Sequence, residues 1–245
     1  MQMTMQVVSF NRHYFAIAFL ACAGGIGLVM LVDDPALQAL FGLGVASALY
    51  FMIASVIASY VVYDASDLYK LHWWPERCLP QSPGDGIVVH AGFDPASAAI
   101  AAAFPRMRLR VLDFFDACTT TEASIQRAHR LNPTADHEEQ IEADHWPVES
   151  ASQDVVFALS AAHELRKTEE RVAFFREARR VLRKDGKVIV IEQLRDLANF
   201  ACFGVAALHF LSRRTWLQSF ASADLTIADE FKITPFMRAF VLQSA

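Results

Sequence analysis

DVVFALSAAHELRKTEERVAFFREARRVLRKDGKVIVIE, residues 154–192, is the stretch that decides the fold of this chain. The apolar run at residues 154–159 predicts a buried strand, and residues 187–192 predict another. Residues 168–183 between them predict an amphipathic helix, whose apolar residues fall along one side among many charges: Val172, Phe175, Val181 and Leu182. Lys184-Asp185-Gly186 predicts the turn that ends this helix. A strand, a helix and a strand in this order indicate a parallel pair with a crossover.

The same alternation continues on both sides of this unit. Further strands are predicted at residues 86–92, 108–115, 138–142, 225–231 and 236–242, and helices at residues 96–104, 121–131 and 212–223. Thr119 or Thr120 is the predicted N-cap of the helix at 121–131. This alternation predicts an α/β fold with a doubly wound, mainly parallel seven-stranded sheet. The last two strands lack an intervening helix and therefore predict an antiparallel element at one edge.

Two long apolar stretches precede this domain, at residues 14–32 and 37–63, and neither contains a charged side chain. Each is long enough to cross a bilayer core as a helix, which takes about 20 apolar residues. A cleaved signal peptide is not expected, because a second apolar run follows directly after Asp33-Asp34-Pro35. We therefore predict a transmembrane helical hairpin. The alternative is a pair of apolar helices packed on the domain or on a partner.

The charges that flank the spans predict the orientation of the hairpin. Arg12 precedes the first span, and Lys70 and Arg77 follow the second, whereas the connecting turn holds only acidic charges. The positive-inside tendency then predicts an inner-membrane protein, anchored through residues 14–63, with its soluble domain facing the cytoplasm. Small residues in the spans predict close helix packing or, equally, a homo-oligomer contact between two hairpins: Ala23, Gly24, Gly25, Gly27, Gly42, Gly44 and Ala46.

Residues 64–83 connect the hairpin, residues 1–63, to the α/β domain, residues 84–245. Their aromatic residues Tyr69, Trp73 and Trp74 are interleaved with basic side chains, a pattern that favours the headgroup layer of a membrane. We interpret this segment as interfacial, followed by a linker that contains Pro75, Pro80 and Pro83. A compatible alternative is that the aromatic rings cap the core of the domain.

Charge and cysteine content exclude several classes of protein. The net charge of −5 argues against a general nucleic-acid binder, which would show a basic face. The four cysteines are far apart, with no CxxC pair and no histidine at metal-ligand spacing: Cys22, Cys78, Cys118 and Cys202. The sequence therefore predicts no disulfide framework and no metal site, and it fits a reducing compartment.

The order of these signals resembles that of the class I S-adenosylmethionine-dependent methyltransferases over residues 84–242, most closely over residues 141–192. There an acid follows the third strand, an aspartate opens the fourth, and a helix, a turn and the fifth strand come next. The resemblance implies a Rossmann-like fold, S-adenosylmethionine as cofactor and S-adenosylhomocysteine as product. The glycine-rich first loop of the family differs here, since only Gly92 is present. His90 stands where the family has an acid, and Asp94 and Ala96 stand at later glycine positions.

The resemblance also implies which residues bind the cofactor. The first loop contributes His90, Ala91, Gly92 and Asp94. An acid at the end of the second strand would bind the ribose hydroxyls, and both Asp113 and Asp116 are candidates.

After the third strand, Asp144 would bind the adenine amino group, while His145 and Trp146 would cover the ring. The alternatives are surface acids at strand ends and a loop in which Trp146 caps the core.

Ser160, His163 and Glu164 follow the fourth strand, where the family lines its methyl-transfer cleft, and Ser160 is a further candidate for binding the cofactor. His163 is a candidate catalytic base, because a histidine titrates near neutral pH, and Glu164 would orient it or act as the base itself. Glu192, at the end of the fifth strand, is another catalytic candidate. The alternatives are a helix cap for His163 and a solvent-facing Glu164. His209 is either a group on the substrate side or an ordinary core histidine.

The sequence therefore predicts a membrane-anchored methyltransferase that acts on a small apolar, lipid-like or membrane-associated acceptor. A second hypothesis is a catalytically degenerate domain that serves as a membrane-tethered interaction module, and the altered glycine loop supports it. A nicotinamide-dependent oxidoreductase is less favoured, because the first strand is not followed by a GxGxxG fingerprint.

Overall fold

A seven-stranded sheet of order β3-β2-β1-β4-β5-β7-β6 forms the centre of the molecule. The computed structural model describes residues 2–74, 83–118, 122–135 and 137–245. The strands are β1 (Asp85–His90), β2 (Arg108–Asp113), β3 (Glu138–Gln140), β4 (Gln153–Leu159), β5 (Leu182–Gln193), β6 (Leu225–Lys232) and β7 (Met237–Ser244). β1 to β5 pair in parallel, whereas β7 runs antiparallel to both β5 and β6. The predicted mainly parallel sheet with an antiparallel edge is confirmed.

One face of the sheet packs against α7 (Thr168–Val181) and α9 (Arg213–Ser222). Alternate strand residues point to this face, because successive side chains in a strand lie on opposite sides. Ile87, Val156 and Val190 meet the aromatic rings of the two helices there, including Phe175 and Phe220. The two helices therefore bury one continuous core.

The C-terminal end of α7 differs from the prediction. β5 begins at Leu182, so the predicted helix to residue 183 and the predicted turn at residues 184–186 are wrong. Arg183 explains the difference, because its guanidinium binds Asp154 at 2.6 Å and Asp85 at 2.8 Å. These ion pairs hold the start of β5 against β4, where the register shifts between Gln153 and Val155. Contacts distant in sequence thus override the local turn signal.

The opposite face of the sheet is covered by α5 (Ser97–Ala103) and by the chain that leaves the hairpin. Leu68, Leu71 and Trp74 are buried there. The Trp74 ring packs against Phe157 of β4, with ring centroids 5.3 Å apart. The alternative that these aromatic residues cap the core is therefore confirmed for Trp74. Four residues used in the predictions of the linker, the orientation and the cysteine pattern lie outside the described residues: Pro75, Arg77, Cys78 and Pro80.

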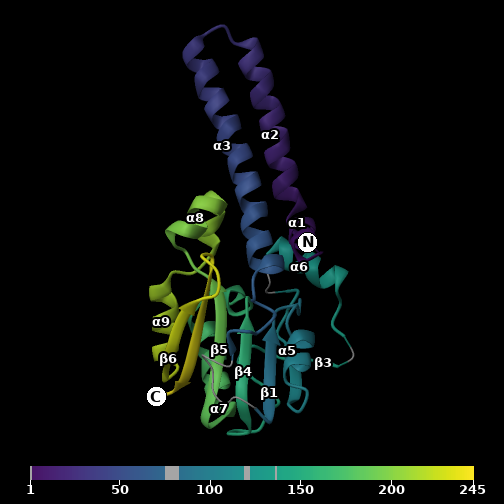
Figure 1. Cartoon of the computed structure of the whole chain (residues 1–245), viewed down its shortest axis with the longest axis vertical. Coiled ribbons are helices and arrows are strands. Elements are labelled where there is room, and N and C mark those ends of the chain that lie inside the picture. Colours follow the sequence, from purple (N-terminus) through teal and green to yellow (C-terminus); the bar gives the residue numbers. More distant parts are fainter. Residues whose placement is uncertain (1, 75–82, 119–121, 136) are drawn as a thin grey trace.

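α2 (Arg12–Leu31) and α3 (Pro35–Tyr60) form a long antiparallel hairpin that rises from one end of the sheet (Figure 1). Both are long and apolar enough to cross a membrane. Their apolar side chains are exposed along most of their length, as the 82% exposure of Met30 illustrates. A Cβ atom at Gly25 would lie 2.6 Å from Val45, so this glycine lets the two helices approach closely.

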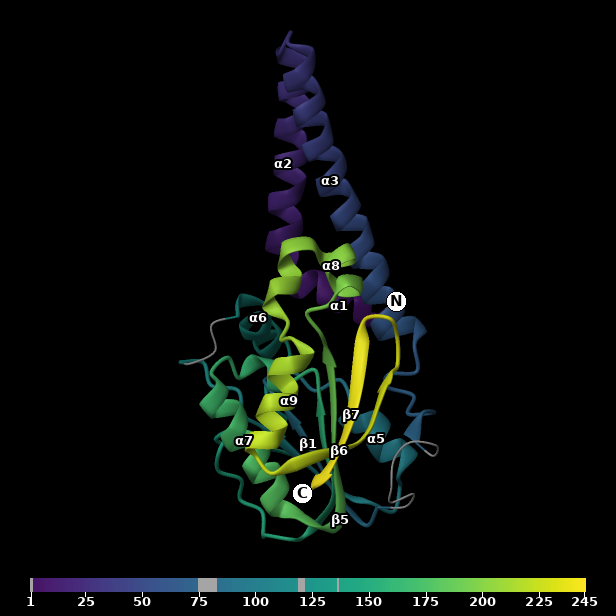
Figure 2. The same cartoon turned by 90° about the vertical axis from the view of Figure 1, so that its left-hand side faces the viewer.

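Three elements near the base of the hairpin were not predicted. They are α1 (Gln2–Phe10), α8 (Leu197–Phe203) and the 3-10 helix η3 (Gly204–His209). α1 is held by Asp64 in the π-turn η1 (Val61–Ala65), whose carboxylate accepts hydrogen bonds from the backbone of Met3 and Thr4. α8 lies beside the base of the hairpin (Figure 2). These elements surround one end of the sheet.

Gly204 allows η3 to approach α3 closely. Its φ of +55° is a backbone conformation that other residues rarely adopt, and a Cβ atom there would meet the Phe51 ring at 3.1 Å. On the other side of the hairpin base, α6 (Ala123–Leu131) begins after Glu122. The predicted caps Thr119 and Thr120 lie outside the described residues.

Candidate active site

A cavity of about 700 Å³ lies between the sheet and the base of the hairpin. Its floor is formed at the carboxyl ends of β1, β4 and β5 by Ala91, Phe93, Ser160, His163, Glu164 and Glu192. Its upper wall includes Phe15, Ala18, Ala48 and Met52 from the two long helices. Ligands of doubly wound sheets bind beyond the carboxyl ends of the strands. The cavity therefore has the position of a binding site and extends to the apolar hairpin.

The structure brings together the three residues predicted to be catalytic. His163 lies in the 3-10 turn η2 (Ala162–Glu164), directly after β4, and Glu192 is near the end of β5. Nδ1 of His163 lies 2.8 Å from a carboxylate oxygen of Glu192, and the His163 backbone amide donates to the other oxygen of Glu192 at 3.2 Å. Nε2 of His163 lies 3.2 Å from Glu164. The imidazole is thus held between two carboxylates.

Burial disfavours the charged form of His163, but the carboxylates of Glu192 and Glu164 outweigh this effect and raise the pKa of His163 well above its ordinary value. Burial alone would raise the pKa of Glu164. The hydrogen bond and positive charge of His163 instead lower it below the ordinary carboxyl range. At neutral pH, the pair is therefore an imidazolium next to an ionised carboxylate.

His209 is a fourth polar residue at this site. Its ring meets that of His163 edge-on, with centroids 5.6 Å apart, and its Nδ1 lies 3.3 Å from Glu122. Burial, followed by the positive charge of His163, lowers the pKa of His209. Arg166 connects the two histidines by donating to both backbone carbonyls, at 3.2 Å for His163 and 2.9 Å for His209. His209 lines the cavity, which favours the substrate-side interpretation over that of a core histidine.

Two features fix the loop that carries His163. Ser160 adopts a φ of +51°, a left-handed conformation that is costly for a residue other than glycine. Arg171 is buried in α7 and donates to the backbone carbonyls of Leu165 and Arg166 at 2.7 and 2.8 Å. No sequence signal separated Arg171 from the exposed arginines of the same helix, because its role depends on a loop that only the fold brings near.

The end of β2 has a different character. The strand ends at Asp113, which is buried, rather than at the predicted Phe115. One carboxylate oxygen of Asp113 accepts the backbone amides of Gly92 and Phe115 at 2.7 and 2.9 Å, and the other accepts the Thr134 hydroxyl at 3.2 Å. Asp113 therefore holds the first loop against the second strand.

His90, at the end of β1, lies between two acids. Its Nδ1 is 3.6 Å from Asp113 and its Nε2 is 3.7 Å from Glu138. Although the ring is buried, neither nitrogen has a hydrogen-bond partner among the residues that the structure describes. The His90 ring is therefore buried at the position of the family's acid, near two carboxylates but not hydrogen-bonded to either.

The rest of the first loop is shaped by aromatic side chains. Gly92 has a φ of +79°, and a Cβ atom there would lie 2.8 Å from the Phe115 ring, so glycine is required. Phe93 packs edge-on against Phe10 of α1, with centroids 5.3 Å apart, and lines the cavity without filling it. Asp94 accepts the amides of Ala96 and Ser97 and so begins α5.

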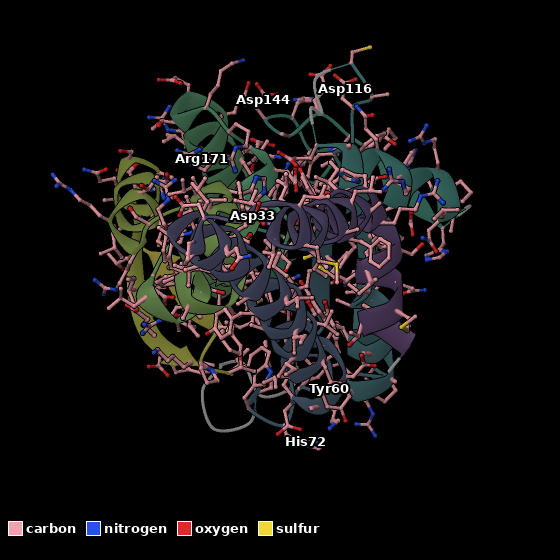
Figure 3. All side chains as sticks on the ribbon, turned by 90° about the horizontal axis from the view of Figure 1, so that it is seen from above. Asp33, Tyr60, His72, Asp116, Asp144 and Arg171 are labelled. Atoms are coloured by element: carbon pink, nitrogen blue, oxygen red, sulfur yellow. The ribbon has the colours of Figure 1, made fainter. Side chains whose placement is uncertain are left out.

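Of the predicted cofactor residues, Ala91 and Ser160 line the cavity. The other eight lie outside its lining, among the residues that the structure describes: His90, Gly92, Asp94, Asp113, Asp116, Asp144, His145 and Trp146. Asp116 and Asp144 are exposed and lie at the outer edge of the molecule when it is viewed down the hairpin (Figure 3). His145, next to Asp144, is also exposed. Trp146 is buried against Phe174, with ring centroids 5.2 Å apart. Trp146 therefore caps the core, which is the alternative to covering the adenine ring. Asp116 accepts the backbone amide of Cys118 at 2.8 Å.

Comparison with known proteins agrees with this geometry. Residues 97–190, which run from α5 to β5, match the family described as methyltransferase domain. This match, together with the fold, supports a class I S-adenosylmethionine-dependent methyltransferase domain. Its sheet order and the cavity at the strand ends fit that assignment. No curated protein matches the sequence.

Solved methyltransferases share the fold of this domain at low sequence identity. The pyocyanin biosynthetic protein PhzM is 14% identical, with a TM-score of 0.56, over 98% of this chain and 72% of PhzM. The mitomycin 7-O-methyltransferase MmcR is 16% identical, with a TM-score of 0.51, over 96% of this chain and 68% of MmcR. A methyltransferase from Aquifex aeolicus is 13% identical, with a TM-score of 0.52, over 80% of this chain and 97% of that protein.

S-adenosylmethionine is the cofactor of this methyltransferase domain. The cavity fits it in two respects, since it lies at the strand ends and its volume of about 700 Å³ accommodates a nucleoside-sized ligand. Ala91, Phe93 and Ser160 form the part of the floor that would hold it. The carboxylates of Glu164 and Glu192 complement a positively charged sulfonium group. The Asp113 carboxylate, which was expected to bind the ribose, is not available for that contact, because it accepts the backbone amides of Gly92 and Phe115.

Proposed function

We propose that the protein is a membrane-anchored methyltransferase whose acceptor is apolar and resident in the membrane. One observation carries the proposal: a single cavity is lined both by the base of the hairpin and by His163, Glu164 and Glu192. A molecule with an apolar body could enter between α1, α2 and α3 and present a polar end to the strand edge. We place the domain on the cytoplasmic side, because Arg12 and Lys70 flank the spans.

Exposed apolar side chains support membrane anchoring. On α2 and α3, residues such as Leu20, Met30 and Leu43 are 68%, 82% and 66% exposed. Leu197 and Val205, in α8 and η3 beside the hairpin, are 88% and 79% exposed. An apolar surface of this extent on a soluble protein would favour aggregation, whereas a bilayer buries it. The entrance to the cavity then lies at the membrane surface.

The residues of this chain have distinct roles in such a reaction. When bound, S-adenosylmethionine supplies a methyl group on a positively charged sulfur. The carboxylate of Glu192 fixes the His163 ring through Nδ1 and the backbone amide. His163 and Glu164 then present a hydrogen-bond donor and acceptor toward the cavity, and the apolar wall holds the acceptor. Alignment of two reactants in this way provides much of the catalysis in group transfer.

The acceptor class can be tested by methyl transfer from tritiated S-adenosylmethionine. The full chain, in vesicles made from a total membrane lipid extract, should place the label in products that partition into organic solvent. Ala18→Phe fills the wall of the cavity and should reduce this labelling at least tenfold, whereas Ala16→Phe, on the exposed side of the same helix, should leave it unchanged. Label found only in water-soluble products would overturn the proposal.

The interaction module without turnover remains a second candidate, because a specific observation favours it. Asp113 is consumed by backbone contacts, and His90 replaces the first acid, so two expected cofactor contacts are missing. A module of this kind need not bind S-adenosylmethionine. Binding of the cofactor by the full chain therefore separates the two candidates.

A homo-oligomer through the hairpin stays a prediction. Gly25 is explained by packing within one hairpin, but a Cβ atom at Gly24, Gly27, Gly42 or Gly44 would meet no described atom within 4 Å.

A further inference from the structure

We propose that His163, Glu164 and His209 form a binding site for a divalent transition-metal ion, with Zn²⁺ as the best match to the donor set. In the proposed methyltransferase, the ion would bind the reacting atom of the acceptor. This role of the ion rests on the proposed function, whereas the metal site itself does not. The sequence predicts no metal site, because the two histidines are 46 residues apart and are brought together only by η2 and η3.

The ligand atoms have the required proximity. One nitrogen of each histidine and one oxygen of Glu164 lie within 4.8 Å of one another. Nε2 of His163 is the nitrogen that faces Glu164, at 3.2 Å. Zinc–ligand bonds are about 2.0–2.2 Å long, so ligands around one ion are separated by roughly 3–4 Å. Small side-chain adjustments would therefore close the triad around an ion, which would displace the proton on Nε2 of His163.

Both histidines have the carboxylate partners that metal sites use. Nδ1 of His163 lies 2.8 Å from Glu192, and Nδ1 of His209 lies 3.3 Å from Glu122. Such partners fix the ring orientation of a ligating histidine and increase its basicity. Arg166 additionally holds the backbone carbonyls of both histidines in place. A simple ion pair between His163 and two glutamates explains neither the position of His209 nor its separate carboxylate.

The site also leaves room for a substrate. All three ligand residues line the cavity of about 700 Å³. Two histidines and one glutamate with an open position are a donor set of catalytic zinc. A cation there stabilises the anion of an acceptor hydroxyl or thiol, whose proton leaves to solvent. Methyl transfer then forms a bond from the oxygen or sulfur to the methyl carbon and breaks the carbon–sulfur bond of the sulfonium. The electron pair of that bond remains on the sulfur. The acceptor class is thus an apolar molecule with an ionisable hydroxyl or thiol.

The test uses the full chain in detergent, stripped with a chelator and titrated with ZnCl₂ by calorimetry. We expect one ion per chain and at least a 100-fold weaker affinity in His209→Ala and in Glu164→Ala. Glu122→Gln, which changes an outer partner, should weaken binding by about 10- to 100-fold. His72→Ala removes an exposed histidine at the edge of the molecule and should leave the affinity unchanged (Figure 3).

Cobalt provides a second readout that does not depend on activity. Addition of CoCl₂ to the stripped protein should produce a visible absorption band, which His209→Ala removes while circular dichroism shows the variant to be folded. Absence of saturable zinc binding, or equal affinity in His209→Ala, Glu164→Ala and His72→Ala, would overturn the site. Cofactor binding by the stripped protein is measured in parallel. If the stripped protein binds zinc but not the cofactor, the methyltransferase proposal is contradicted and the metal site is still supported.

Discussion

The two sides of the strand-end surface of this domain differ in how they use their polar groups. On the β2 side, which consists of His90, Gly92, Asp113 and Phe115, the carboxylate is consumed by backbone amides and the loop is packed by aromatic rings. On the β5 side, which consists of Ser160, His163, Glu164 and Glu192, the polar groups line a cavity. The difference indicates that the β2 side maintains structure, whereas the β5 side is kept available for chemistry.

The largest expected effect is on the β5 side. Glu192→Gln removes the charge that fixes His163, so we expect the rate of methyl transfer to fall by about 100-fold or more. The measurement is the initial rate with tritiated S-adenosylmethionine. Glu169→Gln, at an exposed position of α7, is the matched control and should retain the full rate. Equal rates in the two variants would show that the residues of the β5 side do not contribute to methyl transfer.

The second effect is on the β2 side and concerns stability. Gly92→Val places a Cβ atom against the Phe115 ring in a backbone conformation that valine does not tolerate. We expect a loss of about 2–4 kcal/mol in the free energy of unfolding. Gly27→Ala, where a Cβ atom meets nothing within 4 Å, is the control. Both are compared by thermal unfolding of the full chain in detergent. A wild-type midpoint for Gly92→Val would contradict the tight packing of this loop.

A third prediction distinguishes the two candidates for the ribose contact. Asp113→Asn disturbs a buried carboxylate with three hydrogen bonds and should cost about 1–3 kcal/mol of stability. Asp116→Asn, at an exposed position outside the lining of the cavity, should leave stability nearly unchanged, and neither variant should selectively weaken cofactor binding. Calorimetry on both variants checks this point. A normal stability with a selective loss of affinity in Asp113→Asn would show that the β2 side binds ligand after all.

The smallest expected effect lies at the opposite end of the strands. Burial of Asp154 raises its pKa, but the hydrogen bonds from Arg183 and from the amides of Gly84 and Asp85 outweigh this and lower it. Because the folded pKa is below the unfolded one, the contribution to stability is present above about pH 4 and is lost as the pH falls through the folded pKa. Asp154→Asn should cost about 1 kcal/mol at neutral pH. Below about pH 4, the unfolding midpoint of the variant should fall less steeply with decreasing pH than that of the wild type. The same pH dependence in both proteins would contradict the lowered pKa of Asp154.

The sequence is sufficient to predict the sheet, because alternating apolar strands and one amphipathic helix suffice for a parallel crossover. It misplaces the start of β5, since the ion pairs of Arg183 with Asp85 and Asp154 join residues that are distant in sequence. It places His163, Glu164 and Glu192 correctly at two neighbouring strand ends. Their contact follows from the rule that parallel strands end at a common edge.

The residues that the sequence could not reveal are those that depend on loops. Glu122 and Arg166 lie in separate segments of the chain. The fold brings both to His209, which the sequence offers only as a substrate-side group or a core histidine. The sequence does not decide between Asp113 and Asp116 for a related reason, because the answer depends on the last residue of β2. The strand ends at Asp113, and this places that carboxylate inside the fold and Asp116 at the surface.

Calorimetric titration of the full chain in detergent with S-adenosylmethionine tests the central claim most directly. We expect saturable binding of one molecule per chain. Ala91→Leu, which fills the floor of the cavity, should abolish that binding, and Ala102→Leu, on the exposed side of α5, should retain it. Absence of binding to the native chain, or equal binding by both variants, would contradict the claim that this cavity holds the cofactor.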